Sequence, residues 1–217
     1  MRKIRKWREP SELLEYRKAG DASYGNLPAA AKSAMQRQLV EEQGYLCAYC
    51  TQGIEPTASS MKIEHWVAQS QDPSLELSWD NLLAVCKGNE GHPRADQHCD
   101  TRRRNEPLTV TPLRSPESQG VTYNFSTGDI RSDRSVIHRD LTGPLNLNHQ
   151  TLRKQRKAAC SRLLQLLNQR FPDKTVTRTW LQRMKQRYET GRGGRLEPMS
   201  PVVIALLSRK LERGPAR

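Results

Sequence analysis

The stretch from residue 47 to residue 105 decides the fold that we predict. Its chemically distinctive groups are Cys47-Ala-Tyr-Cys50, Ile63-Glu64-His65, Trp79-Asp80-Asn81-Leu82, Cys86, and His98-Cys99-Asp100 followed by Arg102, Arg103, Arg104 and Asn105. Thiols therefore surround a carboxylate, a histidine and an asparagine. A purely structural zinc finger has no use for those acid and base groups. The combination indicates a cysteine-bound metal that supports a second, catalytic site.

The thiols of this stretch have the character of a zinc site. Four cysteines are the candidate ligands: Cys47, Cys50, Cys86 and Cys99. Structural Zn²⁺ prefers a closed tetrahedron of thiolates that arrive as two pairs. The first two cysteines form a pair by spacing alone, whereas the last two have 12 residues between them, so that segment must loop out. His92 and His98 lie in the segment and could replace a thiol, and buried thiols without a metal are the alternative.

The pattern of the chain predicts an α+β fold that is mainly α. Two short strands are expected at 62–66 and 81–85, with a helix from Asp100 onward, which together make a ββα arrangement. A β-hairpin is expected between residues 121 and 130, around a Ser-Thr-Gly-Asp turn. Helical spacing of apolar residues predicts further helices at 10–19, 29–43, 149–170, 175–190 and 200–211.

Composition divides the chain into four regions. We expect an N-terminal helical segment at 1–44, the metal-bearing ββα motif at 45–110, a linker with the hairpin at 111–150, and a basic helical region at 151–217. Ser11 and Asn148 are the expected N-caps of two helices, because their side chains can accept hydrogen bonds from the first free backbone N–H groups. Gly44 is expected to end the helix that precedes the first cysteine pair.

The positive charge of the chain lies in its last third. Residues 1–150 contain 19 basic and 19 acidic residues, whereas residues 151–217 contain 17 basic and four acidic ones, which accounts for the whole net charge of +13. A polyanion is therefore expected to meet the C-terminal third, with an affinity that falls steeply with salt. The alternatives are an acidic protein partner and a solvated helical face that serves solubility.

The sequence favours a cytoplasmic protein that does not enter a membrane. It has no apolar stretch near the ~20 residues that a membrane span needs, and its basic start lacks the apolar core of a secretory signal. Five cysteines in a reducing compartment argue for metal binding rather than disulfides. Cys160 lies among leucines of an expected helix and is interpreted as a small core residue.

His65 has neighbours that are consistent with a catalytic role. An imidazole with a pKa near ~6.5 can deprotonate water if a neighbour fixes its tautomer and direction, and Asn81 offers an amide for that task. Carboxylates can hold a divalent metal that stabilises a phosphate and its leaving oxygen. Glu64 and Asp100 are the candidates, although Glu64 points to the opposite face of an ideal strand from His65.

These residues resemble a known family, the HNH endonucleases, in which a cysteine-framed ββα-metal motif carries a histidine on its first strand, a middle asparagine and a helix-borne His, Asn or Asp. Within that family the chain is similar to the PtuB-type proteins of Septu and retron-associated anti-phage defence systems. The similarity rests on Cys47-Ala-Tyr-Cys50, Ile63-Glu-His-Trp66, Trp79-Asp-Asn-Leu82 and His98-Cys-Asp-Thr101. It extends over residues 1–160, while the last third is placed by composition alone.

The resemblance implies an endonuclease that hydrolyses phosphodiester bonds as the nuclease subunit of a defence complex with a PtuA-like ATPase. It implies that His65 activates water and that Asn81 positions it. Glu64 and Asp100 would hold Mg²⁺ or Mn²⁺, and an aspartate at that position suits a hard, oxygen-preferring ion. The zinc ligands would be Cys47, Cys50, Cys86 and Cys99.

Three arginines that follow Asp100 are candidates for binding a phosphate held at that metal. They are Arg102, Arg103 and Arg104, and a solvated basic turn is the alternative for each. A non-catalytic zinc module that binds nucleic acid, or an adaptor whose basic region binds protein, remains the competing interpretation of the whole chain. The substrate could be DNA, RNA or tRNA, because phosphate contacts carry no sequence information.

Overall fold

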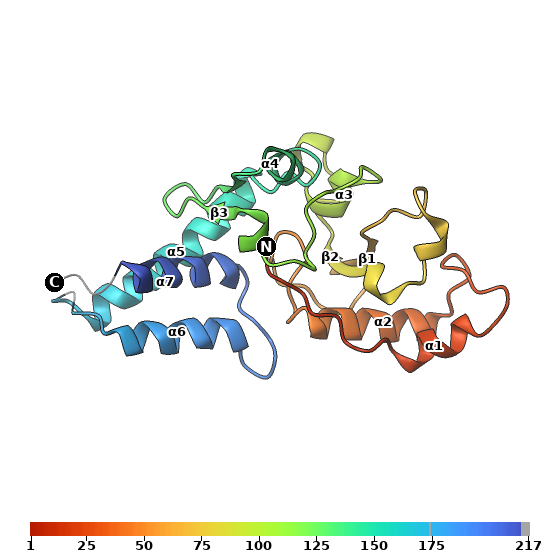
Figure 1. Cartoon of the computed structure of the whole chain (residues 1–217), viewed down its shortest axis with the longest axis horizontal. Helices are drawn as coiled ribbons and strands as arrows, with labels where there is room; N and C mark the ends of the chain where they lie inside the picture. The colour runs from red at the N-terminus through yellow and green to blue at the C-terminus, as the bar shows by residue number, and fades with distance from the viewer. Residues whose placement is uncertain (174, 214–217) are drawn as a thin grey trace.

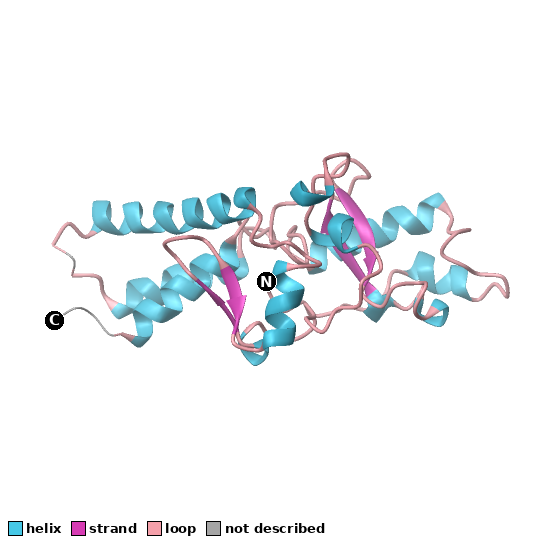
Figure 2. Ribbon diagram, turned by 90° about the horizontal axis from the view of Figure 1, so that it is seen from above, coloured by secondary structure: helices cyan, strands magenta, loops and turns pink. Residues whose placement is uncertain are grey.

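The computed structural model describes residues 1–173 and 175–213, and it is an α+β structure. Its elements within those ranges are α1 (Ser11–Arg17), α2 (Ala29–Glu42), β1 (Met61–His65), β2 (Leu82–Cys86), α3 (Cys99–Arg103), β3 (Val121–Tyr123), β4 (Ile130–Ser132), α4 (Ser135–Thr142), α5 (Gln150–Arg170), α6 (Arg178–Thr190) and α7 (Ser200–Glu212). The two sheets lie in separate halves of an elongated molecule, with the N-terminus between the halves (Figures 1 and 2). Within the described ranges, no helix combines the length and the apolar character that crossing a membrane requires.

The first half is organised around the strand pair β1–β2. The strands are antiparallel, with Met61 opposite Cys86 and His65 opposite Leu82. Every residue of β2 is buried, because α2 and α3 both pack on this strand (Figure 1). A strand covered on both faces is expected to be a continuous apolar run, and Leu-Leu-Ala-Val-Cys fits that pattern. The expected ββα arrangement is confirmed.

The side chain of Gln43 connects the end of α2 to the middle of β2. Its amide nitrogen donates to the carbonyl oxygens of Leu46 and Ala84 at 2.9 and 2.7 Å, and its amide oxygen accepts from the Ala84 N–H at 2.8 Å. The amide therefore pairs with β2 as a neighbouring strand would. Gly44 follows with φ +65, and a Cβ there would approach Leu196 to within 2.7 Å. The predicted helix end at Gly44 is confirmed, and it places the first cysteine pair beside β2.

The basic C-terminal helices are packed against the rest of the protein. α7 packs extensively on α6 and also on α5 (Figure 1). Its start is tied to the first half, because the Met199 N–H donates to the Thr51 carbonyl at 2.9 Å and the Leu196 N–H donates to the Gly44 carbonyl at 3.0 Å. The positively charged region thus has a defined position next to the turn that carries Cys47 and Cys50.

Two predicted helix caps are corrected by the structure. Pro10 is the N-cap of α1 and Ser11 is its first helical residue. His149 is the N-cap of α5, and its side chain accepts from the Thr151 N–H. Asn148 instead holds β4, because its amide exchanges hydrogen bonds of 2.8 and 2.9 Å with the backbone of Ile130. The structure also has a helix that the sequence pattern did not indicate, α4, which packs on β4.

A buried ion pair holds the N-terminal residues against α2 and β2. We expect this pair to contribute strongly to the stability of the first half. The ammonium group of Lys6 contacts the Glu42 carboxylate, donates to the Leu82 carbonyl at 2.9 Å and lies 4.1 Å from the centre of the Trp79 ring. The Glu42 side chain has no solvent exposure. We expect Glu42→Ala to lower the free energy of unfolding by about 3 to 5 kcal/mol, because it leaves a largely buried ammonium unpaired.

Urea denaturation followed by circular dichroism measures this loss. Glu15→Ala is the matched control, since the Glu15–Lys18 pair is about two-thirds exposed on both sides and such pairs contribute less than ~1 kcal/mol. Equal losses in the two variants would contradict the assigned role of Glu42.

Candidate functional site

Four buried cysteines come together from three separate elements. Two belong to the turn after α2, one ends β2 and one begins α3, and they are Cys47, Cys50, Cys86 and Cys99. Their sulfur atoms all lie within 4.8 Å of one another. Within the described ranges they are the only group of three or more His, Cys, Asp or Glu side chains with metal-binding spacing. The looped-out segment predicted between the last two is therefore real, and it returns the last thiol to the others.

The cluster has the chemistry of a structural metal site. Burial raises the pKa of the Cys50 and Cys99 thiols, so charged thiolates at this position need a cation beside them. Thr51 and Cys99 have φ values of 63 and 56, and such backbone costs about 1–3 kcal/mol per residue and persists only where its surroundings hold it. A tetrahedral set of four thiolates suits Zn²⁺. The four cysteines could hold a structural metal such as zinc.

Two nearby histidines were alternative ligands. His98 is buried, with its Nδ1 atom 3.2 Å from the Cys99 sulfur and 4.0 Å from the Cys86 sulfur. It borders the cluster, whereas His92 is exposed and outside it. Because four thiols already gather at one point, the geometry favours the four-cysteine set over a set that contains a histidine.

Glu64 is a buried carboxylate with two side-chain partners, one from the turn after α2 and one from α3. Its Oε1 atom accepts a hydrogen bond from the Tyr49 hydroxyl at 2.9 Å and forms an ion pair with Arg103. Tyr49 lies between the two cysteines of the first pair, so a hydrogen bond connects the thiol-bearing turn directly to Glu64. The turn that carries the first two thiols and the carboxylate are parts of one polar network.

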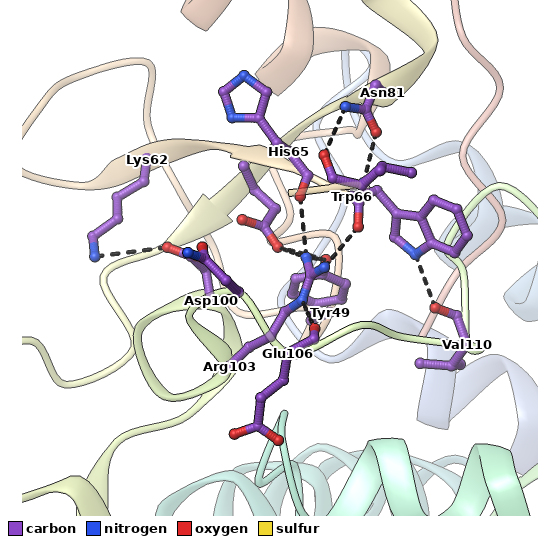
Figure 3. Close-up of polar contacts among 12 residues, drawn as sticks. Tyr49, Lys62, His65, Trp66, Asn81, Asp100, Arg103, Glu106 and Val110 are labelled. Carbon is purple, nitrogen blue, oxygen red and sulfur yellow. Dashed lines mark hydrogen bonds and ion pairs between the residues drawn. The ribbon is translucent and has the colours of Figure 1, made fainter. Parts of the chain in front are cut away.

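Arg103 is completely buried and links α3 to the end of β1. Its guanidinium donates to the carbonyl oxygens of His65, Trp66 and Glu106 at 3.1, 2.6 and 2.8 Å, besides the pair with Glu64 (Figure 3). The predicted phosphate contact of Arg103 is therefore corrected, because these donors are directed at the protein's own backbone and at Glu64. Its location makes it a residue that positions β1.

The other two arginines differ from Arg103 in their surroundings. Arg102 donates from Nε to the Gly143 carbonyl at 3.1 Å and from Nη1 to the Arg94 carbonyl. Arg104 is exposed at the end of α3. Of the three predicted phosphate-binding residues, Arg104 has the side chain best placed to meet a ligand from solvent.

Asp100 provides a second carboxylate close to Glu64. It lies in the first turn of α3 and its side chain is 19% exposed. Burial, followed by the negative charge and a hydrogen bond of Asp100, raises the pKa of Glu64 well above its usual range, although Arg103 opposes this shift. Lys62 lies 3.7 Å from the Asp100 carboxylate (Figure 3). Because the charge of Asp100 disfavours ionisation of Glu64, a cation beside the two carboxylates would stabilise the charged form of Glu64.

His65 is held in one orientation and in one tautomer. Its Nε2 atom lies 3.0 Å from the Glu76 carbonyl oxygen. Because a carbonyl only accepts, Nε2 carries the proton and the neutral ring keeps a lone pair on Nδ1. Burial lowers the pKa of His65, against smaller raising effects of Glu76 and Asp100. A neutral ring with a free Nδ1 lone pair can accept a proton at neutral pH.

The side chains of Glu64 and His65 point to different faces of β1, as neighbouring strand residues do. Figure 3 shows the His65 ring directed away from the Arg103 guanidinium, which lies on the Glu64 face. The ring of Tyr24 packs against the imidazole edge to face, with ring centres 4.5 Å apart and planes at 81°. Tyr24 comes from the loop between α1 and α2, so the N-terminal helical segment covers the histidine.

Asn81 stabilises the loop between the two strands. Its side-chain oxygen accepts from the Val67 N–H at 2.7 Å, and its nitrogen donates to the carbonyls of Val67 and Leu75 at 3.0 and 3.2 Å (Figure 3). The loop begins directly after His65 and contains Glu76, whose carbonyl orients the imidazole. Asn81 therefore holds the loop backbone next to Glu76, and within the described residues its side chain has no hydrogen bond to His65.

Sequence reasoning missed two tyrosines of the site. The position of Tyr49 could have been inferred from the sequence, since it lies inside the Cys-x-x-Cys pair and any residue there must lie near the thiol cluster. No such inference was possible for Tyr24, because it belongs to a different helical segment and meets His65 only in the folded chain. Burial, followed by the charges of Asp100 and Glu64, raises the pKa of Tyr24 to about 12, so its hydroxyl is protonated at neutral pH.

Comparison with known proteins adds no family assignment. No protein-family model matches the chain, and no curated protein matches it either.

The thiol cluster predicts a specific pattern of metal retention. We expect the purified chain to hold one zinc ion, and we expect Cys99→Ser to lose it and to lower the free energy of unfolding by about 5 kcal/mol or more, since metal binding is part of folding in such sites. Elemental analysis and thermal denaturation measure the two effects. Cys160→Ser is the matched control, because Cys160 is buried in α5 away from the cluster. Zinc retention by Cys99→Ser would contradict the ligand set.

Proposed function

We propose that this protein is a metal-dependent HNH endonuclease that hydrolyses phosphodiester bonds, with DNA as the favoured substrate. The single observation that carries the proposal is the state of His65. A carbonyl oxygen at 3.0 Å holds its ring so that Nδ1 is unprotonated, and burial keeps the ring neutral. Together these two features leave Nδ1 able to accept a proton from water. The ββα order of β1, β2 and α3 supports the proposal further.

The carboxylate pair fits a hard divalent ion. Glu64 and Asp100 would hold Mg²⁺ or Mn²⁺, which keeps most of its water ligands and often binds one or two carboxylates together with substrate phosphate. The ion would supply positive charge to the phosphate and to the leaving oxygen. Arg103 bonds to Oε1 of Glu64, which leaves Oε2 for a cation. The four thiolates would hold Zn²⁺ as a scaffold with no part in the chemistry.

The protein's own groups then divide the work of hydrolysis. His65 takes a proton from a water molecule at Nδ1, while the Glu76 carbonyl holds the opposite side of the ring. Asn81 keeps that carbonyl in place through the loop between β1 and β2. Arg103 fixes Glu64 and the backbone of His65 relative to α3, and therefore relative to Asp100. General-base catalysis of this kind contributes about 10²- to 10⁴-fold to a rate.

The proposed biological setting is anti-phage defence, with a PtuA-like ATPase as partner. The setting rests on the resemblance of the cysteine, Glu-His and Trp-Asp-Asn motifs to the PtuB-type proteins. The excess of 17 basic over four acidic residues in residues 151–217 supports attraction of a nucleic acid to α5, α6 and α7, with an affinity that falls with salt.

A non-catalytic zinc module that binds nucleic acid or protein is the second candidate. One observation favours it, since both carboxylates already have cationic neighbours, Arg103 at Glu64 and Lys62 at Asp100. In that case the carboxylates would serve the stability of α3 on β1. The two candidates differ in whether His65 is needed for cleavage of a phosphodiester.

The nuclease proposal predicts that His65→Ala loses cleavage and keeps its fold. We expect the rate of Mg²⁺-dependent nicking of supercoiled plasmid to fall by about 10²-fold or more, because the substitution removes the proposed proton acceptor. The zinc content should stay that of the wild type, since His65 is not a ligand of the thiol cluster. Gel electrophoresis of the plasmid and elemental analysis measure the two results.

His138→Ala is the matched control, because His138 is exposed on α4 and distant in sequence from the motif. It should cut as the wild type does. A His65→Ala protein with full activity would sink the proposal, and metal-independent cleavage by the wild type would overturn the role of Glu64 and Asp100.

A further inference from the structure

Among the described residues, Tyr24 is the only aromatic side chain whose ring packs on the His65 imidazole, and it has no role in the proton transfer proposed for His65. The rings meet edge to face with centres 4.5 Å apart. Such a contact contributes about 0.5–1.5 kcal/mol beyond the buried area. A phenylalanine would make the same contact, so packing alone does not account for the hydroxyl group of this residue.

The loop that carries Tyr24 is held in place by its own hydrogen bonds. The hydroxyl of Tyr16 donates to the Ser23 carbonyl at 2.9 Å and accepts from the Ser23 N–H at 3.0 Å. The residue next to Tyr24 is therefore fixed to α1, and α1 packs on α2. Because Ser23 is anchored to α1 directly before Tyr24, the fold holds the phenol ring against His65.

The hydroxyl of Tyr24 is a free donor at the site. It forms no hydrogen bond within the described part of the chain, and its oxygen is not among the buried polar atoms that lack a partner. The oxygen therefore reaches solvent, although the residue as a whole is only partly exposed. Since the hydroxyl is fixed to a ring that touches the imidazole, it lies within the length of one side chain of the proton-accepting group. A protonated phenol there can donate to an anionic oxygen.

We propose that Tyr24 is a further catalytic residue, whose hydroxyl donates a hydrogen bond to a nonbridging oxygen of the phosphodiester presented to His65. This inference rests on the proposed nuclease function. The oxygens of a phosphodiester are acceptors only, so a donor without a protein partner complements them. The hydrogen bond strengthens as negative charge develops on those oxygens during attack by water.

Two substitutions separate the hydroxyl from the ring. Tyr24→Phe keeps the contact with His65 and removes only the donor, and we expect its kcat to fall by about 10- to 100-fold with a KM within about threefold of the wild type, because the interaction forms mainly in the transition state. Tyr24→Ala also removes the ring and should lose more activity. Tyr188→Phe is the matched control, since Tyr188 is partly buried on α6.

The assay is Mg²⁺-dependent nicking of supercoiled plasmid by the full chain, with thermal denaturation of each variant. If Tyr24→Phe and the wild type have the same melting temperature, the loss of activity comes from the missing hydroxyl group and not from a loss of stability. Wild-type kcat in Tyr24→Phe, with Tyr24→Ala and His65→Ala impaired, would overturn the role of the hydroxyl and leave the nuclease proposal standing. A wild-type chain that does not cut would overturn both.

Discussion

The convergence of four thiols at one point is the constraint on which the first half of this protein depends. The cluster joins the turn after α2, the end of β2 and the start of α3, three elements that are separated in the sequence. β1 and β2 form only a two-stranded sheet, and α3 spans five residues. Elements this small bury little apolar surface, so they need a crosslink, such as a bound metal ion, to hold their positions. A metal held by the thiols would supply it.

The position of the thiol cluster also determines the positions of the two carboxylates, Glu64 and Asp100. Tyr49 extends from the thiol-bearing turn to Glu64, and Arg103 extends from α3 to Glu64 and to the backbone of β1. A shift of the turn or of α3 would therefore move Glu64 relative to Asp100. The structural cluster and the proposed cutting site are close enough that one cannot rearrange without the other.

Much of this arrangement could be predicted from the sequence, for physical reasons. Thiol spacing restricts metal sites strongly, so the four cysteines were identified in advance, and apolar periodicity located β1, β2 and most helices. The direction of individual side chains was less accessible. Three consecutive arginines follow Asp100, and only the register of α3 decides that Arg103 faces inward while Arg104 faces solvent. Asn148 and His149 are likewise adjacent, and both types can cap a helix.

Contacts between distant segments lay beyond the reach of sequence patterns. Tyr24 meets His65 because the loop between α1 and α2 reaches the end of β1, and no local motif marks that approach. Helix α4 was missed because its eight residues follow a hairpin in a stretch rich in polar residues, where packing on β4 supplies its stability. These features depend on tertiary structure, which periodicity and spacing do not encode.

The attachment of α7 to the cysteine-bearing turn has a consequence for how a long polyanion would be handled. The backbone hydrogen bonds from Met199 to Thr51 and from Leu196 to Gly44 attach the basic C-terminal helices directly to the half of the protein that contains Glu64 and Asp100. A strand attracted to the basic helices would therefore meet Glu64 and Asp100 at a set distance along its length. The position at which the basic helices bind a strand would therefore determine which part of that strand contacts the two carboxylates.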